Sequence, residues 1–391
     1  MAFQNDTEFV TTGPKHFKSY TITPEGKFRG KLGNFASLDQ RIACCQFNGS
    51  ECLTGNINGD LYKWSGTQAS VCIAKLHERI IDSIMVGAEY IFTGSRDCKL
   101  KILSKTYALL VSIDLKALNL NSISPEIRAI DMNAAKDKLV IGTFGHEVIE
   151  IAVDVPTKKV GEAQVLIHGH YAPMTKLTNE VWGLCPLQSR RQYVTVSDDA
   201  TLRVWDTDSR KQLSLISLQV DKDGKEVKKN EKTGDINLLA QARAVDIDKS
   251  EEYLALGMRD GSLRVFKAAA EYPYWKEIAS CKCSHAKVPG EWIEDLKFSP
   301  DGQYLVVTSH NNWLYLFEVP KFSKPIRYFS KSSSFITHVD WSLDSQAIRT
   351  NDASYELMYY TVGDGKQQPS GASGYRDEEW STNSCVLSWA T

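Results

Sequence analysis

The chain has 391 residues, and its 46 Lys and Arg residues almost balance its 48 Asp and Glu residues, which leaves a formal net charge of -2. A balance this close to zero provides no chain-wide basic surface for nucleic acid or for an anionic membrane. The longest apolar runs, such as residues 304–308, are far shorter than the roughly 20 residues of a membrane-spanning helix. We therefore expect neither a nucleic-acid partner nor a membrane partner.

The amino terminus and the cysteines favour an intracellular protein. The opening residues, MAFQNDTEFVTTG, lack the basic segment and the apolar core of a secretion signal. The nine cysteines are an odd number scattered through the chain, a pattern that fits reduced thiols better than a disulfide framework. These features predict a cytoplasmic location.

Short β-branched and aromatic runs recur along the chain and align as copies of one unit. Each copy reads as an alternating strand, a polar turn, a second apolar strand, a tight turn with Gly, Asn or Asp, and a third strand that ends on a large side chain. The clear copies are residues 42–65, 81–104, 181–206, 242–267 and 293–318, and weaker copies lie at 127–153 and 335–362. The chain is therefore predicted to be all-β and built from repeats.

A fixed offset inside the repeat predicts the second turn. Asn and Asp side chains accept hydrogen bonds from backbone amides two residues on and tolerate the left-handed region, as a turn between two strands requires. A small polar residue stands six positions before the residue that ends the third strand, and the pairs are Asn58 and Trp64, Asp97 and Leu103, Asp199 and Trp205, Asp260 and Phe266, and Asn311 and Phe317. We predict that the first member of each pair forms a blade turn and that Trp64 and Trp205 end strands.

The length of the repeat indicates a β-propeller. Strand ends are 39 residues apart between Trp64 and Leu103 and 61 residues apart between Trp205 and Phe266. A unit of about 40 to 45 residues with four strands is typical of a propeller blade, and longer spacings are loop insertions. The sequence predicts about seven to eight four-stranded blades of this kind.

The repeats resemble WD repeats through Trp205-Asp206, Ser299-Pro-Asp-Gly302 and Gly169-His170. The Trp-Asp dipeptide is complete once, so the array is divergent. In a WD blade a His, a Ser or Thr, the turn Asp and the Trp share a hydrogen-bonded network. The resemblance implies that His170, Ser197, Asp199 and Trp205 form such a network, which is a role in the scaffold.

Three further stretches resemble the echinoderm microtubule-associated protein family. They are the run from Phe9 to Phe17, the run from Ser334 to Ser342 with Tyr355 to Tyr360, and the closing run from Arg376 to Leu387, with Val181-Trp-Gly-Leu184 between them. The resemblance covers nearly the whole chain. It implies a tandem pair of atypical propellers in the cytoskeleton, bound to tubulin or to microtubules.

The resemblance also predicts how the domains divide. Residues 1–165 are expected to be the last blades of a first propeller, with one closing strand followed by three full blades. Residues 166–391 are expected to be the first blades of a second propeller, with four blades and the beginning of a fifth. On this interpretation the chain is part of a longer one. The alternative is that residues 41–362 close into one seven-bladed ring.

Patterns for catalysis or metal binding are weak. Cys281, Cys283 and His285 supply three potential zinc ligands, whereas structural zinc sites use four ligands with wider spacing within each pair. The sequence has no phosphate-binding loop, dinucleotide fingerprint or nucleophile elbow. We interpret the histidines at positions 146, 168, 170, 285, 310 and 338 as structural. We therefore expect no enzyme activity, metal, cofactor or small-molecule substrate.

Candidate partner contacts lie in one insertion and at three tryptophans. The insertion at residues 220–236 is interpreted as a solvated loop, and the alternative is that its lysines touch an acidic partner surface. Those lysines are Lys222, Lys225, Lys228, Lys229 and Lys232. Trp275, Trp292 and Trp313 are either exposed anchors for a partner or side chains packed between blades.

The functional prediction is a non-enzymatic protein that docks propeller surfaces onto tubulin or onto microtubule-bound proteins. The alternative is a generic WD-repeat scaffold subunit of another multiprotein complex. The expected location is the cytoplasm and its cytoskeleton, including the axoneme of a cilium or flagellum.

Overall fold

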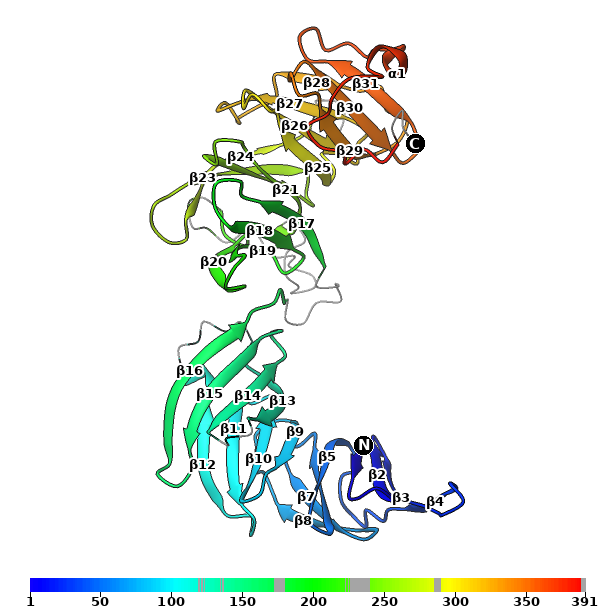
Figure 1. The fold of residues 1–391 in the computed structure, drawn as a ribbon, viewed down its shortest axis with the longest axis vertical. Helices are drawn as coiled ribbons and strands as arrows, with labels where there is room; N and C mark the ends of the chain where they lie inside the picture. The colour runs from blue at the N-terminus through cyan, green and yellow to red at the C-terminus, as the bar shows by residue number, and fades with distance from the viewer. Residues whose placement is uncertain are drawn as a thin grey trace. The chain divides into compact units, whose positions relative to one another are not determined.

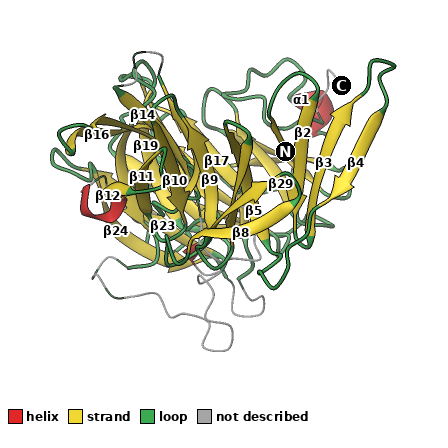
Figure 2. Ribbon diagram, turned by 90° about the horizontal axis from the view of Figure 1, so that it is seen from below, coloured by secondary structure: helices red, strands yellow, loops and turns green. Residues whose placement is uncertain are grey.

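The computed structural model describes residues 1–118, 120, 122, 124–133, 135, 137–171, 180–221, 223, 225, 240–284 and 290–387. The chain divides into two compact units, residues 1–171 and 172–391. Within the described residues, strands form almost all of the regular structure, as Figure 2 shows. No helix in this part of the chain is long and apolar enough to cross a membrane.

The N-terminal unit has four antiparallel four-stranded sheets in its described residues, each a meander of consecutive strands (Figure 1). A 3-10 helix, η1 (Leu115–Leu118), follows the third sheet. The strands are β1 (Ala2–Phe3), β2 (Glu8–Gly13), β3 (His16–Ile22), β4 (Phe28–Leu32), β5 (Ile42–Asn48), β6 (Glu51–Asn56), β7 (Leu61–Ser65), β8 (Gln68–Ile73), β9 (Ile81–Val86), β10 (Tyr90–Ser95), β11 (Lys99–Ser104), β12 (Leu109–Asp114), β13 (Ile127–Met132), β14 (Lys138–Thr143), β15 (Val148–Asp154) and β16 (Lys159–Ile167).

The C-terminal unit has three four-stranded sheets and one three-stranded sheet in its described residues. A short helix, α1 (Gly371–Gly374), follows the last sheet (Figure 1). The strands are β17 (Val181–Pro186), β18 (Gln192–Ser197), β19 (Thr201–Asp206), β20 (Gln212–Ser217), β21 (Ala242–Ile247), β22 (Tyr253–Met258), β23 (Ser262–Ala268), β24 (Trp275–Lys282), β25 (Ile293–Phe298), β26 (Tyr304–Ser309), β27 (Leu314–Glu318), β28 (Arg327–Phe329), β29 (Ile336–Trp341), β30 (Ala347–Asp352) and β31 (Leu357–Thr361).

These eight sheets in the described residues confirm the prediction of an all-β chain built from propeller-type blades. All seven sequence repeats, the two weaker ones included, coincide with the first three strands of a sheet. The first strands of neighbouring sheets contact one another within each unit, for example β5 with β9 and β21 with β25. We call these first strands the innermost strands.

The prediction of a single closing strand before residue 42 is wrong, because residues 2–32 form a complete four-stranded sheet. The sequence signal is weak at both edges of this sheet. Strand β1 has two residues, and every residue of β4 is exposed, so neither strand alternates between apolar and polar side chains. The hairpin between β2 and β3 also differs from the other repeats, since Pro14 and Lys15 alone connect Gly13 to His16.

The hydrophobic core is divided among the spaces between neighbouring sheets. Leu53 and Leu61 of the second sheet pack with Ile81, Ile91 and Leu103 of the third. Similar clusters join the third sheet to the fourth, the fifth to the sixth, the sixth to the seventh and the seventh to the eighth. Each sheet therefore buries its apolar faces against the sheets next to it.

The hairpin between the second and third strands has the same geometry in all seven repeats. Pairs such as Gly55 and Leu61, or Gly257 and Leu263, enclose five turn residues. The fourth turn residue always has a positive φ, and these residues are Gly59, Cys98, His146, Ala200, Gly261, Asn312 and Tyr355. The left-handed residue is thus the one after the predicted turn former.

A β-bulge occurs at the start of every innermost strand from β5 to β29, where the pairing skips the second residue. In the C-terminal unit the skipped residues are Trp182, Arg243, Glu294 and Thr337. A bulge bends its strand and gives the extra residue a new direction. The bulges therefore set the orientation of one side chain from each of four neighbouring strands.

All nine cysteines are free thiols. Five of them are buried and lie in different parts of the chain: Cys52, Cys98, Cys185, Cys283 and Cys385. Burial raises the pKa of Cys185 to about 12, so this thiol stays protonated at neutral pH.

Candidate functional site

Asn58 and Trp64 lie in the second sheet at the places that the repeat assigns to them. Trp64 is buried, stacks on Phe17 with ring centroids 3.6 Å apart, and donates from Nε1 to Thr54 Oγ1 at 2.9 Å. Asn58 donates to Asp39 Oδ2 at 2.7 Å, whereas the amide of Asp60 is bound by Asn56 Oδ1 at 2.9 Å. Asn58 therefore joins its turn to a neighbouring loop.

The other four predicted turn residues accept the amide two residues on, as expected of Asn and Asp in a turn. The acceptor oxygens are Oδ1 of Asp97, Asp199, Asp260 and Asn311, at 2.9, 3.0, 2.9 and 3.2 Å from the amide nitrogen. Trp205 donates from Nε1 to Thr195 Oγ1 at 2.7 Å, which repeats the Trp64 and Thr54 bond. These residues hold the hairpins in shape.

A histidine network of the WD type lies in the third sheet. His77 Nδ1 lies 3.0 Å from Asp97 Oδ2, and His77 Nε2 lies 2.9 Å from Thr93 Oγ1. His77 and Asp97 are almost fully buried. The sequence reasoning missed His77, which follows Leu rather than Gly, although its position 20 residues before Asp97 was a usable signal.

The expected set of His170, Ser197, Asp199 and Trp205 is divided between the two units, since His170 belongs to residues 1–171. The backbone oxygen of His170 lies 2.7 Å from His146 Nδ1. Asp199 pairs with Arg203 Nη2 at 3.0 Å, and both side chains are buried. Arg203 is therefore a charged partner of the turn Asp that the repeat pattern did not indicate.

Four bulge residues of the C-terminal unit line one cavity of about 250 Å³. We call it the bulge pocket, and its lining residues are Trp182, Arg243, Glu294, Asp295, Lys297, Thr337, His338 and Ser384. They come from innermost strands β17, β21, β25 and β29 and from the segment after α1. Residues far apart in the sequence meet here because each innermost strand carries its bulge at the same position.

Arg243 is the most unusual side chain of the bulge pocket. Its Cζ lies 3.9 Å from the ring centroid of Trp182 and 5.2 Å from that of Trp292, so the guanidinium contacts both indoles. The Arg243 side chain is 6% exposed, and its Nη2 lies 3.4 Å from Asp198 Oδ1. Burial lowers the pKa of Arg243 and raises that of Asp198, because this pair compensates only partly for the lost water.

Several buried polar atoms of Arg243 and of the residues next to it have no hydrogen bond. Among the described residues, Arg243 Nε, Arg243 Nη1, Trp292 Nε1 and Asp198 Oδ1 have no hydrogen-bond partner. A buried donor without an acceptor is costly, so such groups usually mark a place where water or a ligand binds. Three of these four atoms are donors, and a carboxylate has the acceptor oxygens that they lack.

Lys297, which also lines the bulge pocket, interacts electrostatically with three carboxylates. Its Nζ is 3.9 Å from Asp295 Oδ1. Burial opposes the charged ammonium, but Asp295, Asp246 and Asp340 together raise the pKa of Lys297. Burial raises the pKa of Asp246 to about 6 and also raises the pKa of Asp295, although Lys297 acts in the opposite direction on both.

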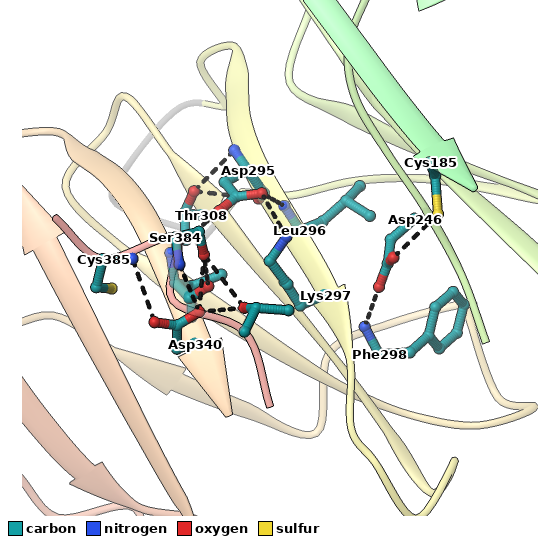
Figure 3. A network of polar contacts seen from close by, with 12 residues as sticks. Cys185, Asp246, Asp295, Leu296, Lys297, Phe298, Thr308, Asp340, Ser384 and Cys385 are labelled. Atoms are coloured by element: carbon teal, nitrogen blue, oxygen red, sulfur yellow. Dashed lines mark hydrogen bonds and ion pairs between the residues drawn. The ribbon is translucent and has the colours of Figure 1, made fainter. Parts of the chain in front are cut away.

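The carboxylates also connect neighbouring innermost strands through backbone amides. Asp246 Oδ2 accepts from the amide of Phe298 at 2.7 Å, and Asp295 Oδ2 accepts from Val339 at 3.1 Å. Figure 3 shows Asp246 beside Cys185 and Phe298, and Asp340 beside Ser384 and Cys385. The amide of Cys385 donates to Asp340 Oδ2 at 3.2 Å. The segment after α1 is therefore bound to β29 by the same kind of carboxylate–amide hydrogen bond that joins β25 to β21.

The predicted partner contacts have different outcomes. Lys225 is exposed, and Lys222, Lys228, Lys229 and Lys232 lie outside the described residues. Trp275 is 3% exposed and packs in the core, which excludes it as an exposed anchor, and Trp292 and Trp313 are half-buried. Trp182, at 45% exposure, is instead the exposed indole next to Arg243.

The described residues contain no group of three or more His, Cys, Asp and Glu side chains arranged to hold a metal ion. His285 of the candidate zinc triplet lies outside them. Cys281 is half-buried and Cys283 is buried, and burial raises the pKa of the Cys283 thiol.

Repeated four-stranded meanders, bulged innermost strands and Trp–Thr and His–Asp bonds define the class as WD-type β-propeller proteins. The family model "Echinoderm microtubule-associated protein second beta-propeller" matches residues 181–391, more than half of the chain. The chain therefore belongs to the echinoderm microtubule-associated protein family.

Relatives resemble nearly all of the chain. Ciliary WD repeat-containing protein ctxp80 of Euplotoides octocarinatus is 26% identical over 98% of this chain and 50% of its own length. Human echinoderm microtubule-associated protein-like 2 is 25% identical over 97% of the chain and 52% of its length, and the 77 kDa echinoderm microtubule-associated protein of Strongylocentrotus purpuratus is 25% identical over 98% and 50%. The chain spans about half the length of these curated relatives.

Proposed function

We propose that this chain is a non-enzymatic, microtubule-associated protein that docks propeller surfaces onto tubulin or onto proteins bound to microtubules. The observation that carries the proposal is the similarity of nearly the whole chain to relatives named as microtubule-associated proteins. The ciliary relative supports a cytoskeletal location that includes cilia or flagella. The absence of a recognisable catalytic motif in the sequence agrees with a binding role.

We propose that the two units are parts of two successive propellers, with residues 1–165 and 166–391 as the divisions. The compact units at residues 1–171 and 172–391 support a boundary within a few residues of this position. The match of residues 181–391 to a second propeller supports the order of the two parts.

Within the second propeller, we propose that the bulge pocket anchors an acidic segment of the partner. Arg243 lines the pocket beside the carboxylates of Glu294 and Asp295 and has two donors without an acceptor, and Trp292 next to Arg243 has a third. The exposed Trp182 offers a large apolar surface next to Arg243. Trp and Arg often contribute most of the binding energy at protein interfaces. The lysines 222, 225, 228, 229 and 232 are proposed as additional contacts that steer the acidic partner toward this unit.

Co-sedimentation with polymerised microtubules tests the proposal. We expect the purified chain to pellet with microtubules at low salt and to pellet less at moderate salt, since salt screens charge attraction. The Arg243→Gln variant should bind at least about fivefold more weakly, because a buried charge contact with the partner is lost.

The matched control is Arg191→Gln, which removes an exposed arginine outside the bulge pocket. Its side chain is 80% exposed and pairs with Asp208 at 3.0 Å. This variant should change microtubule binding by less than about twofold. A folded wild-type chain that fails to pellet at either salt concentration contradicts the microtubule proposal and favours the generic scaffold. If both variants bind microtubules equally well, the proposal that the bulge pocket anchors the partner is contradicted, while the microtubule proposal is not.

A further inference from the structure

The N-terminal unit contains a groove at one end of its third and fourth sheets. The groove has a volume of about 850 Å³, and all of its lining residues belong to this unit. Its lining residues come from the end of β9, the β9–β10 turn, the start of β10, the end of β13 and the end of β15 (the strands are labelled in Figure 1). The others are Gln46 of β5, Asn133 and Asp137 between β13 and β14, and Val155 and Pro156 after β15. A volume of this size accommodates several side chains of a peptide.

The floor of the groove is apolar and includes two methionines. Met85, Tyr90 and Met132 are half-buried, and Phe92 and Val155 are buried. Methionine side chains adapt to different apolar partners because they are unbranched and polarisable. A floor of this kind suits a Leu, Met or Phe side chain from another molecule.

The rim carries four carboxylates: Glu89, Asp131, Asp137 and Asp154. All four are exposed, and among the described residues none of them forms an ion pair. No Lys or Arg is among the described lining residues of the groove. The nearby Lys138 pairs with Glu150 at 2.9 Å, and Lys136 lies outside the described residues.

Local hydrogen bonds hold three of these carboxylates in position, and one of them is the bond from the amide of Thr157 to Asp154 Oδ1 at 3.3 Å. Asp137 Oδ1 accepts from Asn133 Nδ2 at 2.7 Å, and Asp131 Oδ1 accepts from the amide of Met132 at 2.8 Å. Oriented acidic groups around an apolar floor attract cations and raise their local concentration. The groove is therefore complementary to a segment that is apolar in the middle and basic at its edges.

We propose that this groove binds a peptide segment of a partner protein in which an apolar side chain is flanked by Lys or Arg. The chemistry is opposite to that of the bulge pocket, whose unpaired donors suit an acidic partner. The two surfaces lie in different units, so this inference does not depend on the microtubule proposal.

A random 12-residue phage-displayed peptide library, selected on the immobilised full chain, tests the proposal. We expect the enriched peptides to combine Lys or Arg with Leu, Met or Phe. The same peptides, synthesised with a fluorescent label, should bind the Glu89→Gln, Asp131→Asn, Asp154→Asn variant at least about tenfold more weakly, and with a smaller dependence on salt, than they bind wild type.

The matched control variant neutralises three exposed carboxylates elsewhere in the same unit: Asp6→Asn, Glu25→Gln and Glu162→Gln. It should bind the peptides within about twofold of wild type. A Met132→Gln variant should weaken binding through the floor without changing the charge of the rim. Unchanged thermal unfolding of the variants establishes that each is folded. Selection of acidic peptides, of peptides that bind the groove variant and wild type equally, or of no peptide at all would overturn the proposal.

Discussion

At the scale of single residues, the turn between the second and third strands of each repeat holds one residue in the left-handed region, whether or not that residue is glycine. Glycine fills this position in two of the seven repeats, at Gly59 and Gly261. The other five residues, Cys98, His146, Ala200, Asn312 and Tyr355, occupy it with a Cβ atom, which crowds the backbone and, except for Asn, costs about 1–2 kcal/mol. The turn geometry therefore persists because the rest of the hairpin determines it.

Tyr355 allows this cost to be measured, because its φ is 63° and its side chain is 84% exposed. We expect Tyr355→Gly to raise the free energy of unfolding by about 0.5–1 kcal/mol, since relief of strain exceeds the added flexibility of the unfolded chain. Urea unfolding measures the change. Tyr355→Ala, which keeps the Cβ atom, is the control and should give no gain, and an equal gain from alanine would show that strain is not the cause.

The His77 and Asp97 pair is a residue-scale feature with a larger expected effect. Asp97 also accepts from the amides of Glu78 and Lys99, at 3.0 and 2.9 Å. Asp97→Ala leaves His77 Nδ1 and two amides without their acceptor, so we expect a loss of about 2–4 kcal/mol in the free energy of unfolding.

A double-mutant cycle with His77→Ala identifies the part of this loss that belongs to the pair. The two single losses should add to more than the loss in the double variant, because each single change already breaks the shared bond. Burial opposes the charged carboxylate of Asp97, but hydrogen bonds from His77 and the two amides outweigh burial and lower the pKa of Asp97. The stability that Asp97 contributes to folding is therefore present at neutral pH and is lost as the pH falls toward the lowered pKa. A loss that is strictly additive would contradict a direct interaction between the two side chains.

At the scale of elements, Asp246 connects β21 to β25 through the amide of Phe298 while it is buried. Its pKa of about 6 in the folded protein exceeds the value of about 3.9 expected in the unfolded chain. The folded state therefore favours the protonated carboxyl. The stability that Asp246 contributes to folding is complete below about pH 4 and is lost as the pH rises through 6.

The expected consequence is a pH-dependent difference between wild type and Asp246→Asn, whose amide does not ionise. Relative to this variant, wild type should lose up to about 3 kcal/mol of stability between pH 4 and pH 7, because each pKa unit corresponds to about 1.4 kcal/mol. Urea unfolding of both proteins at several pH values measures the difference, and titrating groups that do not interact with Asp246 cancel in the comparison. A constant difference across this range would contradict the raised pKa of Asp246.

Strand pattern and turn chemistry were predictable at this scale because they are local. Trp64, Trp205 and the turn residues carry a fixed offset, and the structure places them in equivalent hairpins. The bulges were not predictable, because an extra residue in a strand leaves no compositional signal. The meeting of Trp182 with Arg243, 61 positions apart, depends on two such bulges and on the packing of β17 against β21.

At the scale of the whole molecule, stability is distributed along a series of sheets. Each core cluster joins two neighbouring sheets, so the contribution of a sheet depends mainly on the sheets beside it. The first sheet illustrates the effect, because Ala2, Val10 and Phe17 are buried against Ile42 and Trp64 of the second sheet. Sequence reasoning located the repeats correctly, but it could not show how these faces combine.

The distribution of the free cysteines has a practical consequence for measuring the motions of this chain. Cys52, Cys98, Cys185, Cys283 and Cys385 are shielded by different sheets or segments and have no disulfide partner. A thiol of this kind reacts with an alkylating reagent only when its surroundings open. Reaction rates at the five positions, resolved by mass spectrometry, would therefore record the opening of individual blades in the native protein, without an engineered reporter group.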